Sequence, residues 1–212
     1  MKENEIQDEL TSIRSMMERS SKFISLSGLS GVMAGVYALI GAGVAWWITF
    51  GADRFDQLNY NAYNDMVDGP LYSNWQKLAI TGIIVFIASI VTGVVLTLRK
   101  AKQKGQSVWG KASKQLLFNL AVPLVTGAVL VLILIARGYF SVVASTTLIF
   151  YGLALVNASN VTYKDVQYLG IIDILLGLLA ALLPGYGLLF WAIGFGVLHI
   201  VYGSIMYLKY DR

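Results

Sequence analysis

Long apolar runs alternate with short polar connections along this chain. A run of about 20 apolar residues can cross a bilayer as a helix, whereas runs of about 10 to 14 are more typical of buried core helices. The pattern predicts six membrane spans, at residues 25–50, 78–98, 115–136, 139–157, 167–183 and 186–208. We therefore expect an all-α fold, a polytopic membrane bundle of six transmembrane helices.

Residues 1–24 differ from the rest of the chain because they are polar and carry charges of both signs. Ile6, Leu10, Ile13 and Met17 recur at helical spacing on one face. The pattern predicts a cytoplasmic amphipathic helix ahead of a six-helix transmembrane domain over 25–212. Such a helix could lie on the membrane surface, continue into the first span or pair with a copy of itself.

Basic residues gather in one connection, which indicates how the chain is oriented. The segment "RKAKQKGQSVWGKASK" (99–114) carries six Lys or Arg residues, whereas 51–77 carries only Arg54 and Lys77 beside four aspartates. Lys and Arg favour the cytoplasmic side of a membrane protein. We expect a multi-pass protein of the cytoplasmic (inner) membrane with both termini cytoplasmic. The same loop could contact anionic lipid, and its role in topology makes nucleic-acid binding unnecessary to explain it.

The predicted external segment 51–77 is acidic and rich in Asn and Tyr. Its aromatic side chains favour a segment that lies along the bilayer surface, where such rings are enriched. A lid or a vestibule that attracts cations is the functional alternative.

Composition narrows the chemistry. Of 212 residues, 57% are hydrophobic and 13% charged, and the chain has no cysteine and a single histidine. Disulfides, thiolate chemistry and a His-rich metal site are thereby excluded. The sequence contains no nucleotide-binding loop, zinc spacing or nucleophile elbow, so we expect no cofactor, no metal and no enzyme activity. The lipid bilayer is the expected partner.

The ends of the even-numbered spans resemble one another: "IVTGVVLTLRK" (90–100), "IFYGLALVNAS" (149–159) and "IVYGSIMYLKY" (200–210). Gly127 and Gly177 precede Gly152 and Gly203 by nearly the same distance. Because repetition indicates a repeated structural unit, the pattern predicts three helical hairpins. Chance resemblance among apolar sequences is the alternative.

Small residues four apart predict close packing of the first span. Hydrophobicity does not hold helices together in lipid, whereas close backbone contact does, and it requires small side chains. Ser27, Gly31 and Gly35 form such a seam, and Ser89 with Gly93 repeats the spacing in the second span. The alternative is that the small residues line a path for a solute.

The segment "YLGIIDILLGLLAALLPGYGLLFWAIGFGVLHIVYGSIMYLKY" (168–210) resembles the hairpin repeat of the HdeD-type acid-resistance membrane proteins. The resemblance implies six spans and a role in envelope stress tolerance without a defined reaction. The segment 51–77 and the amphipathic N-terminus depart from the pattern. The residues of 168–210 that carry the resemblance are Gly170, Gly177, Pro184, Gly194 and Gly203.

Asp173 is the only acidic residue inside a predicted span, and His199 is the only histidine. At 1.5 Å per residue, Asp173, His199 and Asn119 lie about 9, 15 and 8 Å from the cytoplasmic end of their spans, and Asn157 lies at that end. The sequence therefore predicts four polar side chains in the cytoplasmic half of the membrane. They could bind a proton or a solute, or they could join neighbouring spans by hydrogen bonds.

Two function classes follow. The leading hypothesis is a small non-enzymatic integral membrane protein of bacterial envelope or stress type, which acts through helix packing and assembly, including homo-oligomers. The alternative is a small transporter or channel that uses Asp173 and His199. The sequence identifies no small-molecule or ion ligand.

Overall fold

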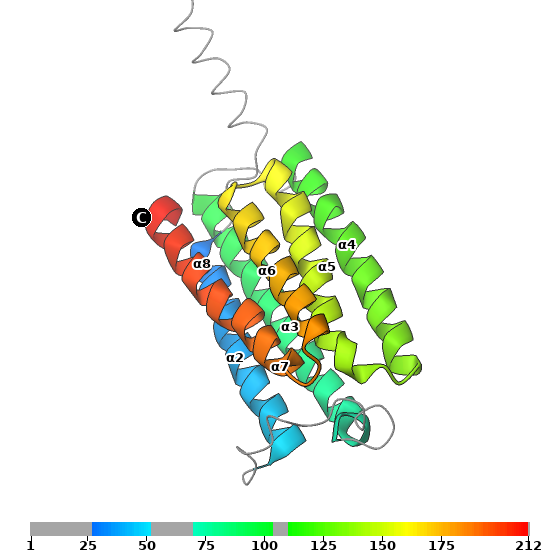
Figure 1. Ribbon diagram of the computed structural model, residues 1–212. Helices are drawn as coiled ribbons and strands as arrows, with labels where there is room; N and C mark the ends of the chain where they lie inside the picture. The colour runs from blue at the N-terminus through cyan, green and yellow to red at the C-terminus, as the bar shows by residue number, and fades with distance from the viewer. Residues whose placement is uncertain (1–26, 52–69, 104–109, 212) are drawn as a thin grey trace, which may run out of the picture.

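The computed structural model describes residues 27–51, 70–103 and 110–211 (Figure 1). These residues are almost entirely helical and contain no strand. The predicted all-α bundle of six spans is confirmed, with ends that differ by a few residues from those expected. The spans are Gly28–Phe50, Asn74–Gln103, Lys111–Ala136, Phe140–Val161, Asp165–Leu182 and Gly187–Tyr210.

Four of the six described spans are single α-helices, and the fourth and the sixth are composite. The first three spans lie in α2 (Gly28–Phe50), α3 (Pro70–Gln103) and α4 (Lys111–Ala136). The fourth joins the short η2 (Phe140–Val142), α5 (Val143–Ala158) and η3 (Ser159–Val161), and the fifth is α6 (Asp165–Leu182). The sixth comprises α7 (Gly187–Trp191), the π-helical η4 (Ala192–Leu198), α8 (His199–Met206) and the π-helical η5 (Tyr207–Asp211).

The connections are shorter than the sequence predicts where they are described. α3 begins at Pro70, so residues 70–77 of the expected external segment are its first two turns. Proline fits the first turn of a helix because its missing N–H is not needed there. At the other end, α3 and α4 extend into the expected 99–114 loop. Residues 1–26 and 52–69 lie outside the described part, and so does the predicted helix 1–24.

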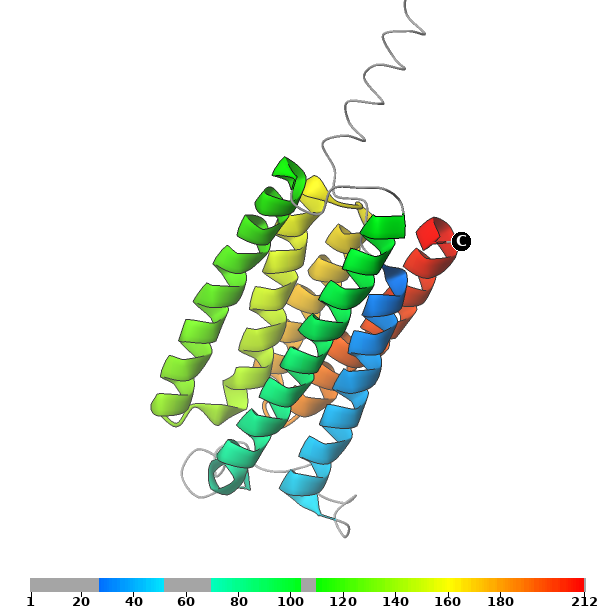
Figure 2. The ribbon, with the colours of Figure 1, turned by 180° about the vertical axis from the view of Figure 1, so that it is seen from behind.

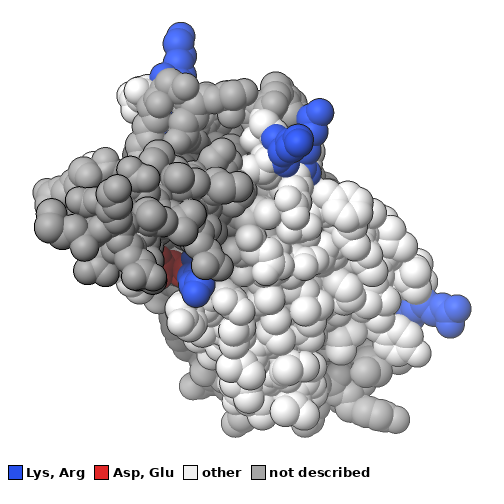
Figure 3. Space-filling model, turned by 90° about the horizontal axis from the view of Figure 1, so that it is seen from above, with Lys and Arg blue, Asp and Glu red and all other residues white. Residues whose placement is uncertain are grey.

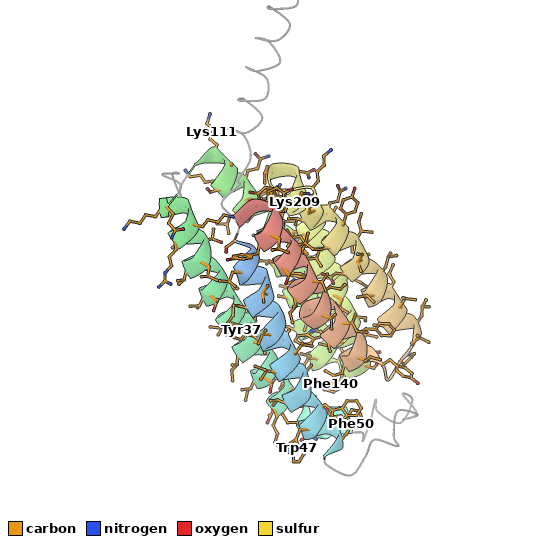
Figure 4. The ribbon with its side chains drawn as sticks, turned by 90° about the vertical axis from the view of Figure 1, so that its left-hand side faces the viewer. Tyr37, Trp47, Phe50, Lys111, Phe140 and Lys209 are labelled. Carbon is orange, nitrogen blue, oxygen red and sulfur yellow. The ribbon has the colours of Figure 1, made fainter. Side chains whose placement is uncertain are left out.

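Tight turns make consecutive spans antiparallel. Gly138, between α4 and η2, has φ 79°, and Gly185, between α6 and α7, has φ 93°. Residues with a side chain rarely adopt these values, so glycine is required at both turns. Lys111 and Lys209 lie at one end of the bundle, and Trp47, Phe50 and Phe140 lie at the other (Figure 4).

Over most of their length the described spans form an open row, but near the end of the bundle that holds Phe140, α3 also contacts η2 of the fourth span, where the Trp75 and Phe140 rings stack with centroids 6.4 Å apart. The order of neighbours is α4, α5, α6, the sixth span, α2 and α3. Over their described residues, the two edge helices, α3 and α4, are not packed against each other, and α5 is seen between them from behind (Figure 2). In the most apolar stretch of α3 no residue is buried within the described bundle, whereas in the most apolar stretch of α6 a third of the residues are buried.

Glycines bring α5 and α6 into backbone contact. A Cβ atom on Gly152 would lie 2.5 Å from the Gly170 carbonyl oxygen and 2.9 Å from the Ile174 nitrogen. A Cβ on Gly170 would lie 2.6 Å from the Gly152 oxygen and 2.9 Å from the Val156 nitrogen. Any side chain at these two glycines would separate the helices. We call this contact the α5–α6 seam.

The contact between α8 and α2 repeats that geometry, and we call it the α8–α2 seam. A Cβ on Gly203 would meet the Gly28 oxygen at 2.7 Å and, closer still, the Val32 nitrogen. A Cβ on Gly28 would meet the Gly203 oxygen at 2.6 Å and the Tyr207 nitrogen. Gly152, Val156, Gly170 and Ile174 therefore correspond to Gly203, Tyr207, Gly28 and Val32. The correspondence supports the predicted repeat, because two hairpins use one motif in the same way.

The predicted Ser27–Gly31–Gly35 seam lies on this contact, shifted by one residue at its start. A Cβ atom on Gly35 would lie 2.6 Å from the Gly196 oxygen, and a Cβ atom on Gly31 would lie 3.1 Å from the Gly203 Cα. Ser27 precedes α2, and its carbonyl accepts a hydrogen bond from the Ser30 hydroxyl. The glycine that makes the closest approach is Gly28.

Candidate functional site

Three polar side chains from three spans lie at the same depth. Tyr151, Asp173 and His199 stand at or next to the midpoints of the spans Phe140–Val161, Asp165–Leu182 and Gly187–Tyr210. Asp173 is thus deeper than the distance of about 9 Å expected from the sequence, because α6 begins at Asp165. We call Tyr151, Asp173, Gly194 and His199 the central polar site.

His199 is held by one hydrogen bond on each ring nitrogen. Its Nδ1 lies 2.8 Å from the Gly194 carbonyl oxygen, and its Nε2 lies 2.8 Å from the Tyr151 hydroxyl. A carbonyl oxygen can only accept, so Nδ1 carries the hydrogen and donates it. In the neutral ring Nε2 is then an acceptor, and the Tyr151 hydroxyl donates to it. The side chain is buried, with 5% of its surface exposed.

The π-helical turn of η4 brings this ring nitrogen to the carbonyl. Gly194 lies in η4, and His199, the first residue of α8, follows it by five residues. A π-helix has wider turns than an α-helix, and single π turns inside helices often occur at functional sites. The His199 backbone N–H donates to the Gly196 oxygen. Local backbone geometry therefore fixes both the position and the tautomer of His199.

Asp173 is fully buried and makes no hydrogen bond to any described residue. Its exposed fraction is 0%, and neither carboxyl oxygen has a partner. A Cβ atom on Gly194 would lie 3.0 Å from Asp173 Oδ1 and 2.5 Å from Leu148 Cδ2. Because Gly194 has no side chain, it leaves room for the Asp173 carboxyl group. Its carbonyl oxygen accepts the hydrogen bond from His199. Asp173 and His199 both contact this residue but are not bonded to each other.

Aromatic rings pack beside His199. The Phe195 ring lies 4.9 Å from the Tyr151 ring and 6.0 Å from the His199 ring, between centroids, and Trp191 lies 5.0 Å beyond Phe195. Aromatic neighbours at these distances fix the orientation of a ring. The imidazole is therefore restrained by ring packing as well as by its two hydrogen bonds.

The two predicted asparagines belong to a different place. The Asn119 side-chain amide donates to the Asn157 carbonyl oxygen at 3.1 Å, which joins α4 to the end of α5. Asn157 lies six residues beyond Tyr151, about 9 Å along the helix. The four predicted site residues therefore form two groups, a central one with Asp173 and His199 and an end group with Asn119 and Asn157.

Sequence reasoning missed Tyr151 and Gly194. Tyr151 belongs to the repeated "IFYG" pattern, where it counts as one more apolar residue, and Gly194 is one of many glycines. A tyrosine at the midpoint of a span was the available signal, because a buried hydroxyl needs a partner. Nothing in the sequence marks the Gly194 carbonyl.

Other polar links cross between spans nearer their ends. Asp165 accepts from Lys209 at 3.0 Å and from the Tyr210 hydroxyl at 2.8 Å, which ties the start of α6 to η5. The described residues contain no cluster of three or more His, Cys, Asp or Glu side chains that could hold a metal ion.

The fold and the central polar site define a class, the multi-pass α-helical membrane proteins that carry ionisable groups within the bilayer. Comparison of the chain with protein-family models, curated proteins and solved structures gives no match. The resemblance to HdeD-type proteins stays a prediction from the sequence.

Proposed function

We propose that the chain is a small proton-linked transporter whose central polar site binds and releases protons. The observation that carries the proposal is Asp173, which lies at the midpoint of a span, fully buried and without a hydrogen-bond partner among the described residues. An ionisable group at this depth is costly and is a functional-site hypothesis by default.

A purely structural role for Asp173 has little support. Polar residues that join membrane helices do so by hydrogen bonds. Tyr151 and His199 make such bonds, but Asp173 makes none to a described residue. An unpaired carboxylate in an apolar interior is neutralised by a proton or compensated by a cation. Binding of a charged species is the role that the surroundings of Asp173 favour.

The neighbouring pair can take up a proton without losing a bond. If Nε2 of His199 is protonated, it donates to the Tyr151 oxygen, because a tyrosine hydroxyl both donates and accepts. Nδ1 still donates to the Gly194 carbonyl. Asp173 and His199 are thus two protonatable groups on either side of one glycine. Because Asp173 has no exposed surface, exchange with either side requires water entry or a second arrangement of the helices.

Purified protein in liposomes with a pH-sensitive dye tests the proposal. We expect proton flux under a pH or solute gradient, with at least a tenfold loss in Asp173→Asn and near-normal flux in Asp173→Glu. Thr92→Val is a matched control, because it removes a half-buried polar group from α3, away from the site. Absence of flux from the wild type in every gradient would overturn the proposal.

We further propose that the protein lies in the cytoplasmic (inner) membrane with both termini on the cytoplasmic side. The support for this orientation is the distribution of charge. Figure 3 views the molecule from the end that carries most of the described Lys and Arg side chains. The described basic residues of this end are Arg99, Lys100, Lys102, Lys111, Lys114, Lys164 and Lys209, against Lys77 and Arg137 at the other. Basic residues favour the cytoplasmic side.

A thiol-labelling experiment checks the orientation, since the chain has no native cysteine. In intact cells, a membrane-impermeant maleimide should label Arg137→Cys and not Lys164→Cys. Labelling of Lys164→Cys alone would reverse the orientation.

The hypothesis of a non-enzymatic envelope protein that acts by assembly is supported by a different region. The edge helices α3 and α4 expose large apolar side chains and have few neighbours in the chain. The stress-related role remains a proposal that rests on the sequence resemblance.

A further inference from the structure

The fourth and fifth spans lie close to the sixth span only in one half of the bundle. α5 and α6 pack against α7, and α6 also packs against η4, whereas both come close to α8 at few points or none. In this half a Cβ atom on Gly187 would lie 3.2 Å from Ala144 Cβ, and one on Gly194 would lie 2.5 Å from Leu148 Cδ2. The backbones therefore diverge toward the end that holds Lys209, which we call the basic end, and side chains bridge the space between them.

The half of these three spans that lies on the far side of the central polar site from the basic end contains no titratable side chain. No Asp, Glu, Lys, Arg, His or Tyr occurs in the three segments concerned, 140–150, 174–182 and 187–198. The hydroxyls of Ser145, Thr146 and Thr147 donate to carbonyl oxygens of the preceding turn at 2.8 Å. This half therefore provides no ionisable group that could carry a proton between the central polar site and the opposite end.

The half toward the basic end contains a cluster of charged and phenolic side chains. Asp165, at the start of α6, accepts from Lys209 Nζ at 3.0 Å and from the Tyr210 hydroxyl at 2.8 Å. The Tyr210 ring stacks on the Tyr163 ring, with centroids 4.1 Å apart. The side chains of Asp165 and Lys209 are 26% and 53% exposed, so the cluster is open to the surface. We call Tyr163, Asp165, Lys209 and Tyr210 the basic-end cluster.

Tyr202 of α8 lies between the basic-end cluster and the central polar site. It follows His199 by three residues, about 4.5 Å along the helix, and precedes Tyr210 by eight, about 12 Å. Side chains of a helix lean toward its N-terminus, which for Tyr202 is the direction of His199. The phenol interacts electrostatically with Asp165 and Tyr210 on one side and with Tyr151 on the other. Tyr202 therefore belongs to the surroundings of both groups.

The Tyr202 side chain is suited to pass a proton on. It is half-buried, and its hydroxyl forms no hydrogen bond to another described residue. A tyrosine hydroxyl can accept one hydrogen bond and donate another at the same time. Its oxygen can therefore take a proton from the side of Asp165 while its own proton leaves toward the central polar site, so that no charge remains on the phenol. Direct transfer along α6 is too long, because Asp165 and Asp173 are eight residues, about 12 Å, apart.

We propose that Tyr202 connects the central polar site to the basic-end cluster, so that Asp173 exchanges its proton with the basic end in the described arrangement of the helices. The inference rests on the proposed function, in which Asp173 binds the proton, and adds a direction to it. With the proposed orientation, the described arrangement is the one that faces the cytoplasm. Exchange with the other side then requires a second arrangement, because the opposite half is packed without ionisable groups.

Hydrogen–deuterium exchange at the Asp173 carboxyl tests the connection. At acid pH, infrared spectra of the full-length protein in lipid should contain a protonated-carboxyl C=O band that is missing in Asp173→Asn and shifts when H2O is replaced by D2O. We expect this shift to be at least tenfold slower in Tyr202→Phe, which keeps the ring but lacks the hydroxyl. Thr146→Val is the matched control, because it removes a buried hydroxyl from the opposite half. Equal rates for Tyr202→Phe and the wild type, or slowing by Thr146→Val instead, would overturn the proposal.

Proton flux in liposomes separates this inference from the proposed function. Tyr202→Phe should reduce the flux at least tenfold, whereas Tyr207→Phe, on the same span but 43% exposed, should leave it unchanged. Both variants should unfold at the wild-type temperature, because neither loses a hydrogen bond between described side chains. Flux that depends on Asp173 but not on Tyr202 would overturn this inference and leave the proposed function standing. Exchange that depends on Tyr202 in a protein without flux would support the connection and overturn transport.

Discussion

The α5–α6 seam and the part of α3 around Gly93 carry the same local motif, but among the described residues only the glycine of the seam is packed against a neighbouring helix. In the seam, Gly152 and Gly170 bring two backbones together, and a side chain on either would strike the partner helix. On α3, Gly93 stands in open space. The difference does not arise in the motif itself. It arises in the next odd-numbered helix of the chain: α6 has Gly170 and packs on α5, whereas α4 has Leu120 at the corresponding position and does not pack on α3 over their described residues. A glycine seam in lipid therefore needs small residues on both sides.

The largest expected effect separates the seam from an uncovered glycine. Gly152→Leu should prevent the folded state or cost about 3 kcal/mol or more, because the side chain must displace backbone atoms of α6. Gly43→Leu should unfold at or slightly above the wild-type midpoint, because its Cβ meets nothing and leucine favours the helix over glycine. Thermal unfolding and gel filtration of the full-length protein in detergent measure both. Equal midpoints for Gly152→Leu and the wild type would contradict the described packing.

An effect of intermediate size is expected when side-chain hydrogen bonds are removed, one in the central polar site and one between α2 and α3. Tyr151→Phe should cost about 1 kcal/mol, because it leaves the buried Nε2 of His199 without a donor. Tyr37→Phe removes the longer 3.3 Å contact with Thr92 on α3 and should cost less, about 0.5 kcal/mol. Reversible unfolding in mixed micelles gives both free energies. A larger loss for Tyr37→Phe would show that the central polar site is not the stronger link.

The smallest expected effect is that of Gly→Ala substitutions on the unfolding free energy, which should rise at uncovered glycines and fall at a glycine of the α5–α6 seam. Gly43→Ala and Gly93→Ala should raise the unfolding free energy of the detergent-solubilised monomer by about 0.5 kcal/mol, since alanine favours the helix and meets no neighbour. Gly170→Ala should lower it, because its methyl group would press on the Gly152 oxygen. The same micelle titration measures all three variants, and a gain for Gly170→Ala would contradict the seam.

Much of the fold could be predicted because apolar run length is a local property. Six spans follow from six runs, and Gly31 and Gly35 were identified by their spacing alone. The Ser89–Gly93 spacing also predicted packing, but a Cβ on Gly93 would meet no atom of the described residues within 4 Å. Spacing shows that a face is small, whereas contact depends on what the adjacent helix presents.

The candidate site was predicted in part for a similar reason. Asp173 and His199 were identified because ionisable groups are rare in membrane spans. Their grouping with Tyr151 and Gly194, and apart from Asn119 and Asn157, depends on helix rotation and on the π-helical turn. Those features depend on contacts between residues far apart in the chain.

The amino-acid sequence by itself determined that the chain crosses a membrane six times and that its ionisable groups within the spans are few, because lipid selects for long apolar runs. Tertiary structure alone decided which glycines touch a neighbour, that Asp173 has no hydrogen-bond partner in the described bundle, and that α3 keeps an uncovered face. In lipid the apolar pattern does not distinguish one neighbour from another, so close packing and hydrogen bonds between helices make that choice.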